Sequence, residues 1–411
     1  MKAQFEKEQS ASGEFQRQAD AFRDWISSDG ATGYPAVADR YHLYISLACP
    51  WASRTLIARK LLGLEKVIGL TVVDPVRDER GWAFRDPNSD STGGASSQEP
   101  FASTDPINGF HFLFEAYRLT DPNFDGRVTI PALWDKVTKK IVNNCEDDIC
   151  RMFNDAFRGL AQNKEIDLFP RDIAAEQEKL SDFIYDKINN GVYKAGFTTR
   201  QHVYERACQQ LFDALDQLEE RLARSRYLFG TRIVETDWRL FCTLIRFDVV
   251  YYIHFKCSLR RILDYHNLQG YLIDLYQHDG IAETVNFDHI KRHYYMTHGA
   301  IKLAENIDVT IAQPVANHLY WITREAVANA VKHGHARRIL INLRQRNGTA
   351  ELKIEDDGIG FSKLDGVESR GLGLKLMTRR AELAGGVLQI ADAVPHGVIV
   401  RCEVQICDEN E

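Results

Sequence analysis

The sequence predicts a multidomain chain in which an α/β domain is followed by an all-helical domain and then by an α+β domain. Three observations lead to this prediction. Apolar, β-branched runs alternate with amphipathic helical runs between residues 41 and 150. Helical patterning dominates from about residue 150 to 300, and after residue 305 a helix is followed by strands with a hairpin signal.

Composition narrows the class of protein. The chain has 411 residues, of which 44% are hydrophobic and 27% charged, which is typical of soluble proteins with two or three domains. The net charge of -7 argues against nucleic-acid binding. We expect no membrane segment and no secretory signal, because apolar runs of the required length are missing. Eight cysteines without CxxC pairs or zinc-like spacing indicate a reducing, cytoplasmic location.

The first part of the chain predicts a small sheet with helices. Residues 1–40 are polar and contain scattered Gly and Ser, so we expect a loose arm. Strands are expected at 41–48, 66–74, 127–135 and 139–144, and helices at 52–64 and 111–119. This order is that of a thioredoxin-like domain, which we assign to residues 41–155. The polar loop at 87–106 is of a length that is usually functional or mobile.

The second and third parts of the chain differ in predicted secondary structure: the second is helical, and the third combines helices with strands. The all-helical domain is assigned to residues 156–303, with helical runs at 174–189, 203–225, 236–255 and 267–277. The last domain, at residues 304–411, has expected helices at 314–334 and 370–386. Its strands are expected at 307–311, 337–345, 350–356, 387–392 and 397–406, and an Asn-Gly turn joins the second and third of these.

Cys49 is the first candidate for chemistry. In LACPWASRTL it follows a strand and precedes a helix, where backbone N–H groups and the helix dipole stabilise a thiolate. The sequence therefore predicts a lowered pKa and a good nucleophile. A thioredoxin would carry a second cysteine at the position of Ala52, so the resolving thiol must come from outside, and glutathione is the obvious source. The alternative is that Cys49 is only a small buried residue.

A second cue is the Ile130-Pro131 pair at the start of a strand. In thioredoxin-like folds a proline at this point is normally cis, and the preceding backbone groups pair with a bound peptide such as glutathione. The alternative is an edge-strand proline without such a role.

Six segments in order resemble the glutathionyl-hydroquinone reductases, the Xi class of the glutathione transferase superfamily. They are LACPWASRTL, GWAFRD, GRVTIPALWD, GVYKAGF, FDVVYYIHFKC and NFDHIKRHYY, and the resemblance runs from about residue 15 to about residue 300. The resemblance implies a thioredoxin-like domain, an all-helical glutathione-transferase domain and a homodimer. It also implies that Cys49 attacks the sulfur of a glutathionyl-hydroquinone, after which a second glutathione resolves the mixed disulfide.

The resemblance assigns further roles. Trp82 and Arg127 would hold glutathione, the arginine through a carboxylate, and Ile130, followed by Pro131, would pair with its backbone. Tyr193 and Tyr294 would line the quinone pocket and donate hydrogen bonds, and His298 is expected nearby. The alternative for each aromatic residue is a place in the core.

Three positions depart from the family. Glu-Ser usually follows IVNN and grips the γ-glutamyl end of glutathione, but here Cys145 and Glu146 follow. The family's glutamate position is occupied by Cys145, and the carboxylate, that of Glu146, comes one residue later in the chain. Glutathione binding is therefore expected to be weakened or rearranged. Ser53 replaces a common histidine. The helix-capping box begins with Val234 in place of a hydroxyl residue, a change that costs on the order of 1 kcal/mol of helix stability.

The last domain carries a second group of candidate functional residues. Glu325 and Asn329 lie four apart on one helix, Asp356 begins DDGIG after a strand, and RGLGL opens a helix with Gly371 and Gly373. Together these resemble the N box and glycine boxes of the histidine-kinase-type ATPase domain, the Bergerat (GHKL) fold. The nearest variant is the nitrate-sensor class of bacterial kinases.

This resemblance implies an ATP site. Asn329 would ligate Mg²⁺, Glu325 would orient or deprotonate a water or the phosphoacceptor, and Asp356 would bind the adenine amino group. Gly358 and Gly360 allow close approach to the base, and the glycine pair at the helix start cradles phosphate. The usual threonine is replaced by Val398.

Three functional hypotheses follow. The first is a glutathione-dependent reductase with an ATP-binding appendage, and the second is a redox- or quinone-responsive signalling protein. The third is a chimera in which neither half works well. No hairpin with a phosphoacceptor histidine precedes residue 305, so phosphotransfer needs a partner phosphoacceptor or response regulator. The short junction at 297–311 indicates a fusion, either natural or made by joining fragments.

Overall fold

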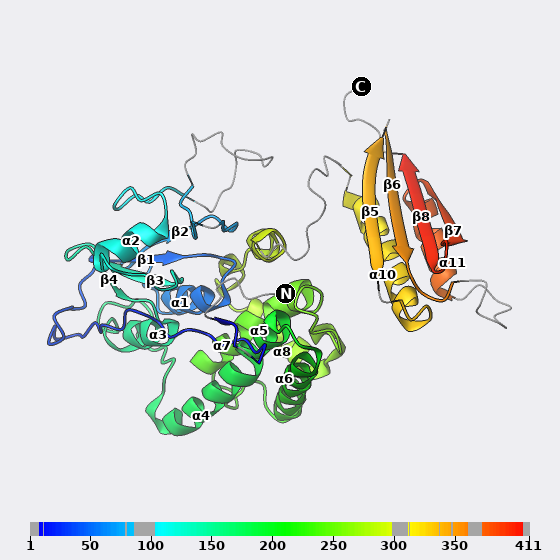
Figure 1. The fold of residues 1–411 in the computed structure, drawn as a ribbon. Coiled ribbons are helices and arrows are strands. Elements are labelled where there is room, and N and C mark those ends of the chain that lie inside the picture. The colour runs from blue at the N-terminus through cyan, green and yellow to red at the C-terminus, as the bar shows by residue number, and fades with distance from the viewer. Residues whose placement is uncertain are drawn as a thin grey trace. The chain divides into compact units, whose positions relative to one another are not determined.

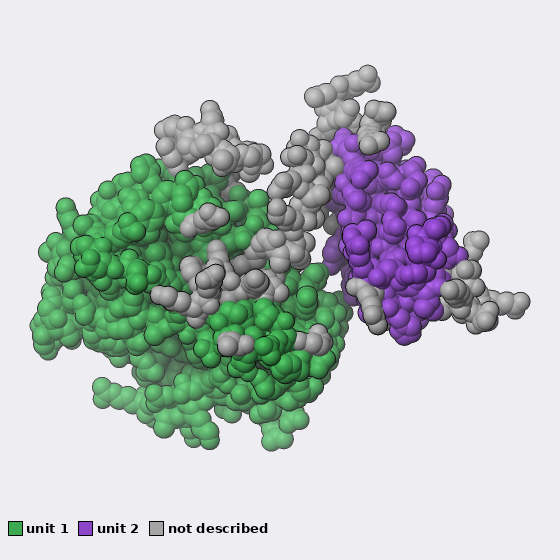
Figure 2. All heavy atoms as spheres, viewed as in Figure 1, with its two compact units in different colours: residues 1–301 green, residues 302–411 purple. Residues whose placement is uncertain are grey.

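The computed structural model describes residues 8–10, 12–78, 80–85, 103–297, 311, 313–336, 338–346, 348–360 and 372–405. The chain divides into two compact units, residues 1–301 and residues 302–411 (Figure 2). Apart from Ile311, the strand expected at 307–311 lies outside the described residues, and so does most of the polar loop at 87–106.

The first unit begins with a four-stranded sheet. Its order is β2-β1-β3-β4, with β1 and β2 parallel and the other pairs antiparallel. The sheet and its helices have the bounds β1 Tyr41–Ile45, β2 Gly69–Val72, β3 Ala132–Asp135, β4 Lys140–Asn143, α1 Pro50–Leu61, α2 Leu113–Thr120 and α3 Glu146–Asp155 (Figure 1). This topology confirms the predicted thioredoxin-like domain.

Helices make up the remainder of the first unit, as the sequence predicts. They are α4 Ala174–Ile184, α5 Gly191–Phe197, α6 Gln201–Leu222, α7 Glu235–Arg246, α8 His266–Tyr276 and α9 Phe287–Arg292. Within the described chain, π-helical segments continue three of them, at Tyr185–Asn189, Phe247–Tyr251 and His293–Thr297. Such segments are frequent at functional sites. Tyr185 and Tyr294, in two of these segments, line cavities that also contain Cys49, and Tyr251 in the third is hydrogen-bonded to Tyr294.

The start of α7 shows the effect of the missing hydroxyl. The Asp237 carboxylate accepts the Val234 N–H at 2.9 Å, so one half of the capping box is formed. The other half is absent because a valine side chain has no acceptor for the helix N–H groups.

The described residues of the N-terminal arm are packed against the rest of the first unit, so the prediction of a loose arm was wrong for them. The Phe15 side chain is 7% exposed and Ile26 is fully buried in the core of the first unit. The Phe22 N–H donates to the Asn144 side chain at 2.8 Å, which ties the arm to the segment between β4 and α3. A few apolar residues among polar ones carry no periodicity, so the sequence did not indicate this packing.

The second unit is a four-stranded antiparallel sheet with two helices on one face (Figure 1). The strand order is β5-β6-β8-β7. The core joins Ile322 of α10 and Met377 of α11 to Ile354 and Val404 of the sheet. The bounds are α10 Gln313–Lys332, β5 Ile339–Arg346, β6 Thr349–Asp356, α11 Leu372–Leu383, β7 Gly386–Asp392 and β8 Val398–Gln405.

Candidate active site and nucleotide site

Cys49 occupies the N-cap position of α1, directly before Pro50 in the first helical turn. Its side chain is 8% exposed, and its thiol donates to the Ile130 carbonyl oxygen at 3.4 Å. The Ile130–Pro131 peptide bond is cis. The structure therefore brings together the two features that the sequence singled out, although they are 81 residues apart.

The predicted direction of the Cys49 pKa was wrong. Burial is the largest influence and raises the pKa of the thiol above its usual value. The backbone N–H groups of Ala52 and Trp51 and the charges of Arg246 and Arg17 all lower it, but by less. The sequence indicates the helix N-terminus, which lowers the pKa of the thiol. It does not show how deeply the thiol is buried, and burial raises the pKa.

Two cavities meet at Cys49. The larger, of about 360 Å³, extends from Cys49 to Asp20, Cys145 and Glu146. The smaller, of about 60 Å³, extends from Cys49 to Tyr193 and Tyr294. Both cavities are also lined by Trp51, Trp82, Arg17, Arg77 and Arg127. A thiol at this junction can react with a molecule that fills both spaces.

Three tyrosines form a hydrogen-bonded cluster at the smaller cavity. The hydroxyl of Tyr294 lies 2.7 Å from that of Tyr193 and 3.0 Å from that of Tyr251. Burial raises the pKa of all three phenols, so they remain protonated donors. The sequence indicated Tyr193 and Tyr294, whereas Tyr251, in the quoted FDVVYYIHFKC segment, was not assigned a role.

Trp82 forms part of the wall that the two cavities share. Its side chain is 4% exposed and stacks on the His293 ring at 5.1 Å, and the Arg77 guanidinium lies 4.9 Å above its ring. Burial lowers the pKa of Arg77 to about 10, and the nearby charge of Arg127 acts in the same direction. The wall is thus aromatic and cationic, which suits an anionic ligand with an apolar part.

Arg127 lines both cavities, but it is paired within the chain. Its guanidinium forms an ion pair with Glu8 of the N-terminal arm, a residue that is 2% exposed. The sequence predicts a glutathione carboxylate as the partner of this guanidinium and gives no indication of Glu8.

Arg246 holds the backbone that leads into Cys49. Its guanidinium donates to the carbonyl oxygens of Leu47 at 3.1 Å and Ala48 at 3.0 Å. It also donates to the Ser53 hydroxyl at 2.7 Å and to the Cys242 carbonyl at 2.8 Å. All four acceptors are neutral, so a cation that is 1% exposed lies beside the thiol without a carboxylate among these contacts.

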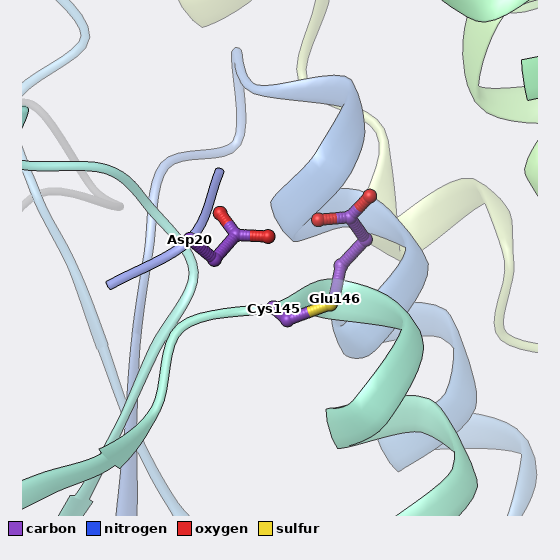
Figure 3. A group of neighbouring side chains, drawn as sticks. All are labelled: Asp20, Cys145 and Glu146. Carbon is purple, nitrogen blue, oxygen red and sulfur yellow. The ribbon is translucent and has the colours of Figure 1, made fainter. Parts of the chain in front are cut away.

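The far end of the larger cavity is acidic. Asp20 of the arm points toward Cys145 and Glu146 at the start of α3, and their donor atoms lie within 4.8 Å of one another (Figure 3). Burial raises the pKa of Glu146 to about 7 and that of Cys145 to about 12. The pKa of Asp20 is also raised by burial. Cys145 and Glu146, which replace the family's Glu-Ser pair, thus line the larger cavity together with the Asp20 carboxylate of the arm.

The second unit gathers most of the predicted nucleotide residues. Asp356 ends β6, is 8% exposed and accepts the Gly358 N–H at 2.8 Å through one carboxylate oxygen. A Cβ on Gly358 would lie 2.4 Å from the Gly334 carbonyl oxygen, so the loop after β6 fits closely against the end of α10. Gly360 has φ +85°, which favours glycine.

Glu325 and Gly373 lie in contact, although they are far apart in the sequence. A Cβ on Gly373 would stand 2.1 Å from Glu325 Oε1, so α10 and α11 approach each other at these residues. Asn329 lies one turn further along α10. Gly371 and His298 lie outside the described residues. Among the described residues, the closely approached glycines and the carboxylate and amide side chains are of the types that would suit an Mg²⁺-nucleotide.

Comparisons with known proteins agree with the two units. Residues 201–272 match the family described as glutathione S-transferase, C-terminal domain. Residues 315–407 match the histidine kinase-, DNA gyrase B-, and HSP90-like ATPase family. Among the described residues, no helix combines the length and apolar character needed to cross a bilayer.

Individual relatives extend this result. Glutathionyl-hydroquinone reductase YqjG of Escherichia coli is 49% identical over 298 residues, which are 71% of this chain and 87% of that protein. Its glutathione-bound structure superposes with a TM-score of 0.65 and 47% identity, covering 71% of this chain and 93% of that one. Sensor histidine kinase LiaS of Bacillus subtilis is 33% identical over 104 residues, 25% of this chain and 29% of that kinase.

The two cavities that meet at a single thiol, the cis Ile130–Pro131 bond and the tyrosine cluster belong to the part of the chain that these relatives cover. The chain therefore belongs to the glutathionyl-hydroquinone reductase family of glutathione transferases, and it carries a C-terminal histidine-kinase-type ATPase domain.

Proposed function

We propose that this protein reduces glutathionyl-hydroquinones with glutathione, and that Cys49 is the nucleophile. The observation that carries the proposal is the position of Cys49 where the larger cavity meets the tyrosine-lined one. A glutathionyl-hydroquinone has a peptide and an aromatic diol joined at one sulfur, so its two parts match the two spaces. The solved glutathione-bound relative supports glutathione as the co-substrate.

The reaction has two steps. The first is attack of a thiolate on a thioether sulfur, and the second is a thiol–disulfide exchange. The Cys49 thiolate attacks the thioether sulfur, forming a Cys49–glutathione disulfide as the bond from sulfur to the ring carbon breaks. The ring carbon takes the electron pair and a proton, so the quinol ring is reduced by two electrons while sulfur is oxidised. A second glutathione thiolate then attacks the disulfide, which releases oxidised glutathione and restores the Cys49 thiolate.

The surrounding residues bind and orient the substrate. Tyr193 and Tyr294 donate hydrogen bonds to a quinol oxygen, and their raised pKa values keep these donors protonated at neutral pH. The Ile130 backbone, with Pro131, pairs with the peptide of glutathione. Trp82 and Arg127 hold its remainder, and Glu146 faces the γ-glutamyl end.

The C-terminal domain binds ATP in this proposal. Asn329 would hold Mg²⁺, which would offset the charge of the phosphates, and Asp356 would accept a hydrogen bond from the adenine amino group. Glu325 orients a water or phosphoacceptor, while the glycines at 358, 360, 371 and 373 form the cradle. Since the match to ATPase domains favours it, a second candidate function is redox- or quinone-responsive signalling with a partner phosphoacceptor or response regulator.

Assembly, location and domain limits are also proposed. The protein works as a cytoplasmic homodimer, on the pattern implied by the Xi-class resemblance. Its domains are the arm at 1–40, the thioredoxin-like domain at 41–155, the helical domain at 156–303 and the ATPase domain at 304–411.

The test is the intact mass after treatment with oxidised glutathione, together with turnover of a glutathionyl-hydroquinone. We expect a gain of one glutathione that Cys49→Ala abolishes along with turnover. Cys208→Ala is the matched control, because Cys208 is a buried free cysteine of the same unit that lines neither cavity. Full turnover by Cys49→Ala would refute the proposed mechanism.

A further inference from the structure

Arg17 of the N-terminal arm lines both cavities at Cys49. Its guanidinium carbon lies 4.3 Å from the centre of the Trp51 ring, 5.1 Å from that of Tyr193 and 5.8 Å from that of Phe15. Of the two cavities, Tyr193 and Phe15 line the smaller one alone. These stacking contacts therefore place the charge of Arg17 beside the tyrosine-lined cavity, where the proposed function puts the quinol ring.

The charge of Arg17 is not neutralised by a partner in the described part of the chain. Its Nε donates to Asn190 Oδ1 at 2.9 Å, and an amide oxygen is neutral. Burial raises the pKa of Asp20 and the charge of Arg17 counteracts this, yet no ion pair of the described residues joins the two side chains. Stacking on aromatic rings engages the faces of a guanidinium, so the N–H groups of Nη1 and Nη2 stay available to a ligand.

The charge of Arg17 acts on groups that the proposed reaction uses. Burial raises the pKa of the Tyr193 phenol, and Arg17 is the largest influence in the opposite direction. Burial also raises the pKa of the Cys49 thiol, and Arg17 is one of four groups that lower it. A negative group on a ligand in this space would be stabilised by the same charge.

The wall of the smaller cavity suits an aromatic anion. Its rings come from Phe15, Trp51, Tyr193, Phe197 and Tyr294, and the charged residues that the structure describes there are Arg17, Arg77, Arg127 and Glu8. Positive charge thus outweighs negative charge. Arg127 forms an ion pair with Glu8, and Arg77 stacks on Trp82, a residue that both cavities share. Arg17 therefore keeps its charge for a ligand on the quinol side of the site.

We propose that the quinol part of the substrate carries a carboxylate on its aromatic ring, and that Arg17 binds this carboxylate. The inference rests on the proposed function, because it names the class of quinol that the same site takes. The substrate is then the glutathione thioether of a dihydroxybenzoate in place of a neutral hydroquinone. The carboxylate takes no part in the exchange at sulfur, so the two steps and their electron balance are unchanged.

A neutral quinol suits this wall less well. When it covers Arg17, the guanidinium loses water from its N–H groups and gains no acceptor of comparable strength. A carboxylate replaces that water with charge-assisted hydrogen bonds, and its two oxygens match the planar fork of a guanidinium. Hydrogen bonds to charged groups are strong enough to change affinity about tenfold.

The test compares the glutathione thioethers of 2,5-dihydroxybenzoate and of 2,5-dihydroxybenzamide, joined at the same ring position. The two ligands contain the same glutathione and differ by one charge on the ring. Calorimetric titration uses the full chain with Cys49→Ala, which removes the proposed nucleophile and so binds both thioethers without consuming them. We expect the carboxylate thioether to bind about tenfold more tightly than the carboxamide thioether.

Substitution of Arg17 in the same background locates the preference. Arg17→Met should abolish it, whereas Arg17→Lys should keep part of it, since an ammonium retains the charge but not the planar fork. The carboxamide thioether should bind nearly as before, which reports an intact site. Arg224→Met is the control, because it removes an exposed arginine that lines neither cavity, and it should leave the preference unchanged.

Equal affinity of the Cys49→Ala chain for the two thioethers would overturn the inference, and this comparison needs no change at Arg17. Equal weakening of both thioethers by Arg17→Met would also overturn it, because Arg17 would then act on glutathione or on a quinol oxygen.

The inference and the proposed function fail separately, since binding is measured without turnover. Tighter binding of the carboxylate thioether, without its reduction by the chain that retains Cys49, supports the inference and contradicts the proposed reaction. Reduction of both thioethers together with equal binding does the reverse.

Discussion

Glu8 and Arg127 form an ion pair next to Cys49, although 119 residues separate them in the sequence. Arg127 lines both cavities and Glu8 lines the smaller one. The guanidinium that the sequence assigns to a glutathione carboxylate is thus already paired with a carboxylate from the arm. Glutathione must share this cation with Glu8 or displace it.

Glu8→Gln is therefore expected to strengthen glutathione binding. Removing the internal carboxylate leaves the charge of Arg127 to the ligand, and a hydrogen bond to a charged group is worth enough to lower the KM for glutathione about three- to tenfold. Steady-state kinetics with varied glutathione measures this change. Glu14→Gln, which removes an exposed arm carboxylate paired with Arg206, is the matched control. A raised KM in Glu8→Gln would show that Glu8 helps to hold the ligand.

The contrast between Cys49 and Glu8 shows what the sequence could predict. Cys49, Ile130, Tyr193 and Tyr294 lie in short segments whose order and local pattern indicate a role, and the structure brings them together at the two cavities. The roles themselves stay predictions. The order of strands and helices along the chain and the helical domain were predicted because strand and helix periodicities are local signals.

Contacts over long separations were not predictable in the same way. Glu8, Asp20 and Arg246 are ordinary charged residues in their own segments, and only the folded chain places them beside the thiol cavities. The predicted direction of the Cys49 pKa was wrong for a related reason. The helix N-terminus is visible in the sequence, whereas the burial that outweighs it depends on the packing of the whole unit.

Arg246 is expected to support the ionised form of Cys49. Its charge lowers the pKa of the thiol, so Arg246→Met should raise this pKa. Arg246→Lys retains the charge and changes the pKa less. The measurement is the rate of Cys49 alkylation by iodoacetamide as a function of pH, followed by mass spectrometry.

The unfolding temperature of the two variants separates the electrostatic role of Arg246 from its role as a hydrogen-bond donor to the backbone. Arg246→Met leaves the carbonyl oxygens of Leu47 and Ala48 without their donor, at about 1–3 kcal/mol for each unsatisfied group. Arg246→Lys keeps donors at one nitrogen only and so loses part of the set that the planar guanidinium reaches. Both variants should therefore unfold at lower temperature, but only Arg246→Met should shift the alkylation profile. The same profile in both variants would restrict Arg246 to holding the backbone.

Tyr251 is expected to orient the hydroxyl of Tyr294. It is fully buried and lies 3.0 Å from that hydroxyl, while Tyr193 lies on the cavity wall. Tyr251→Phe removes one partner of a three-member network, which should lower kcat about fivefold with little change in KM, since about 1 kcal/mol is lost. Tyr204→Phe, which removes an exposed hydroxyl bound to the Lys256 carbonyl, should leave kcat unchanged. An unaltered kcat in Tyr251→Phe would contradict an orienting role.

Gly373→Ala tests the ATP site by separating nucleotide binding from stability. The added Cβ would meet Glu325 Oε1 at 2.1 Å, so the carboxylate must move into the space between α10 and α11. Alanine is nevertheless the better helix former by about 1 kcal/mol, and α11 begins at Leu372, so the unfolding temperature should hold or rise. Affinity for a fluorescent ATP analogue with Mg²⁺ should fall about tenfold or more. Thr378→Ala, an exposed change on the same helix, should leave affinity intact. If Gly373→Ala bound nucleotide as tightly as the parent chain, the phosphates could not lie at the start of α11.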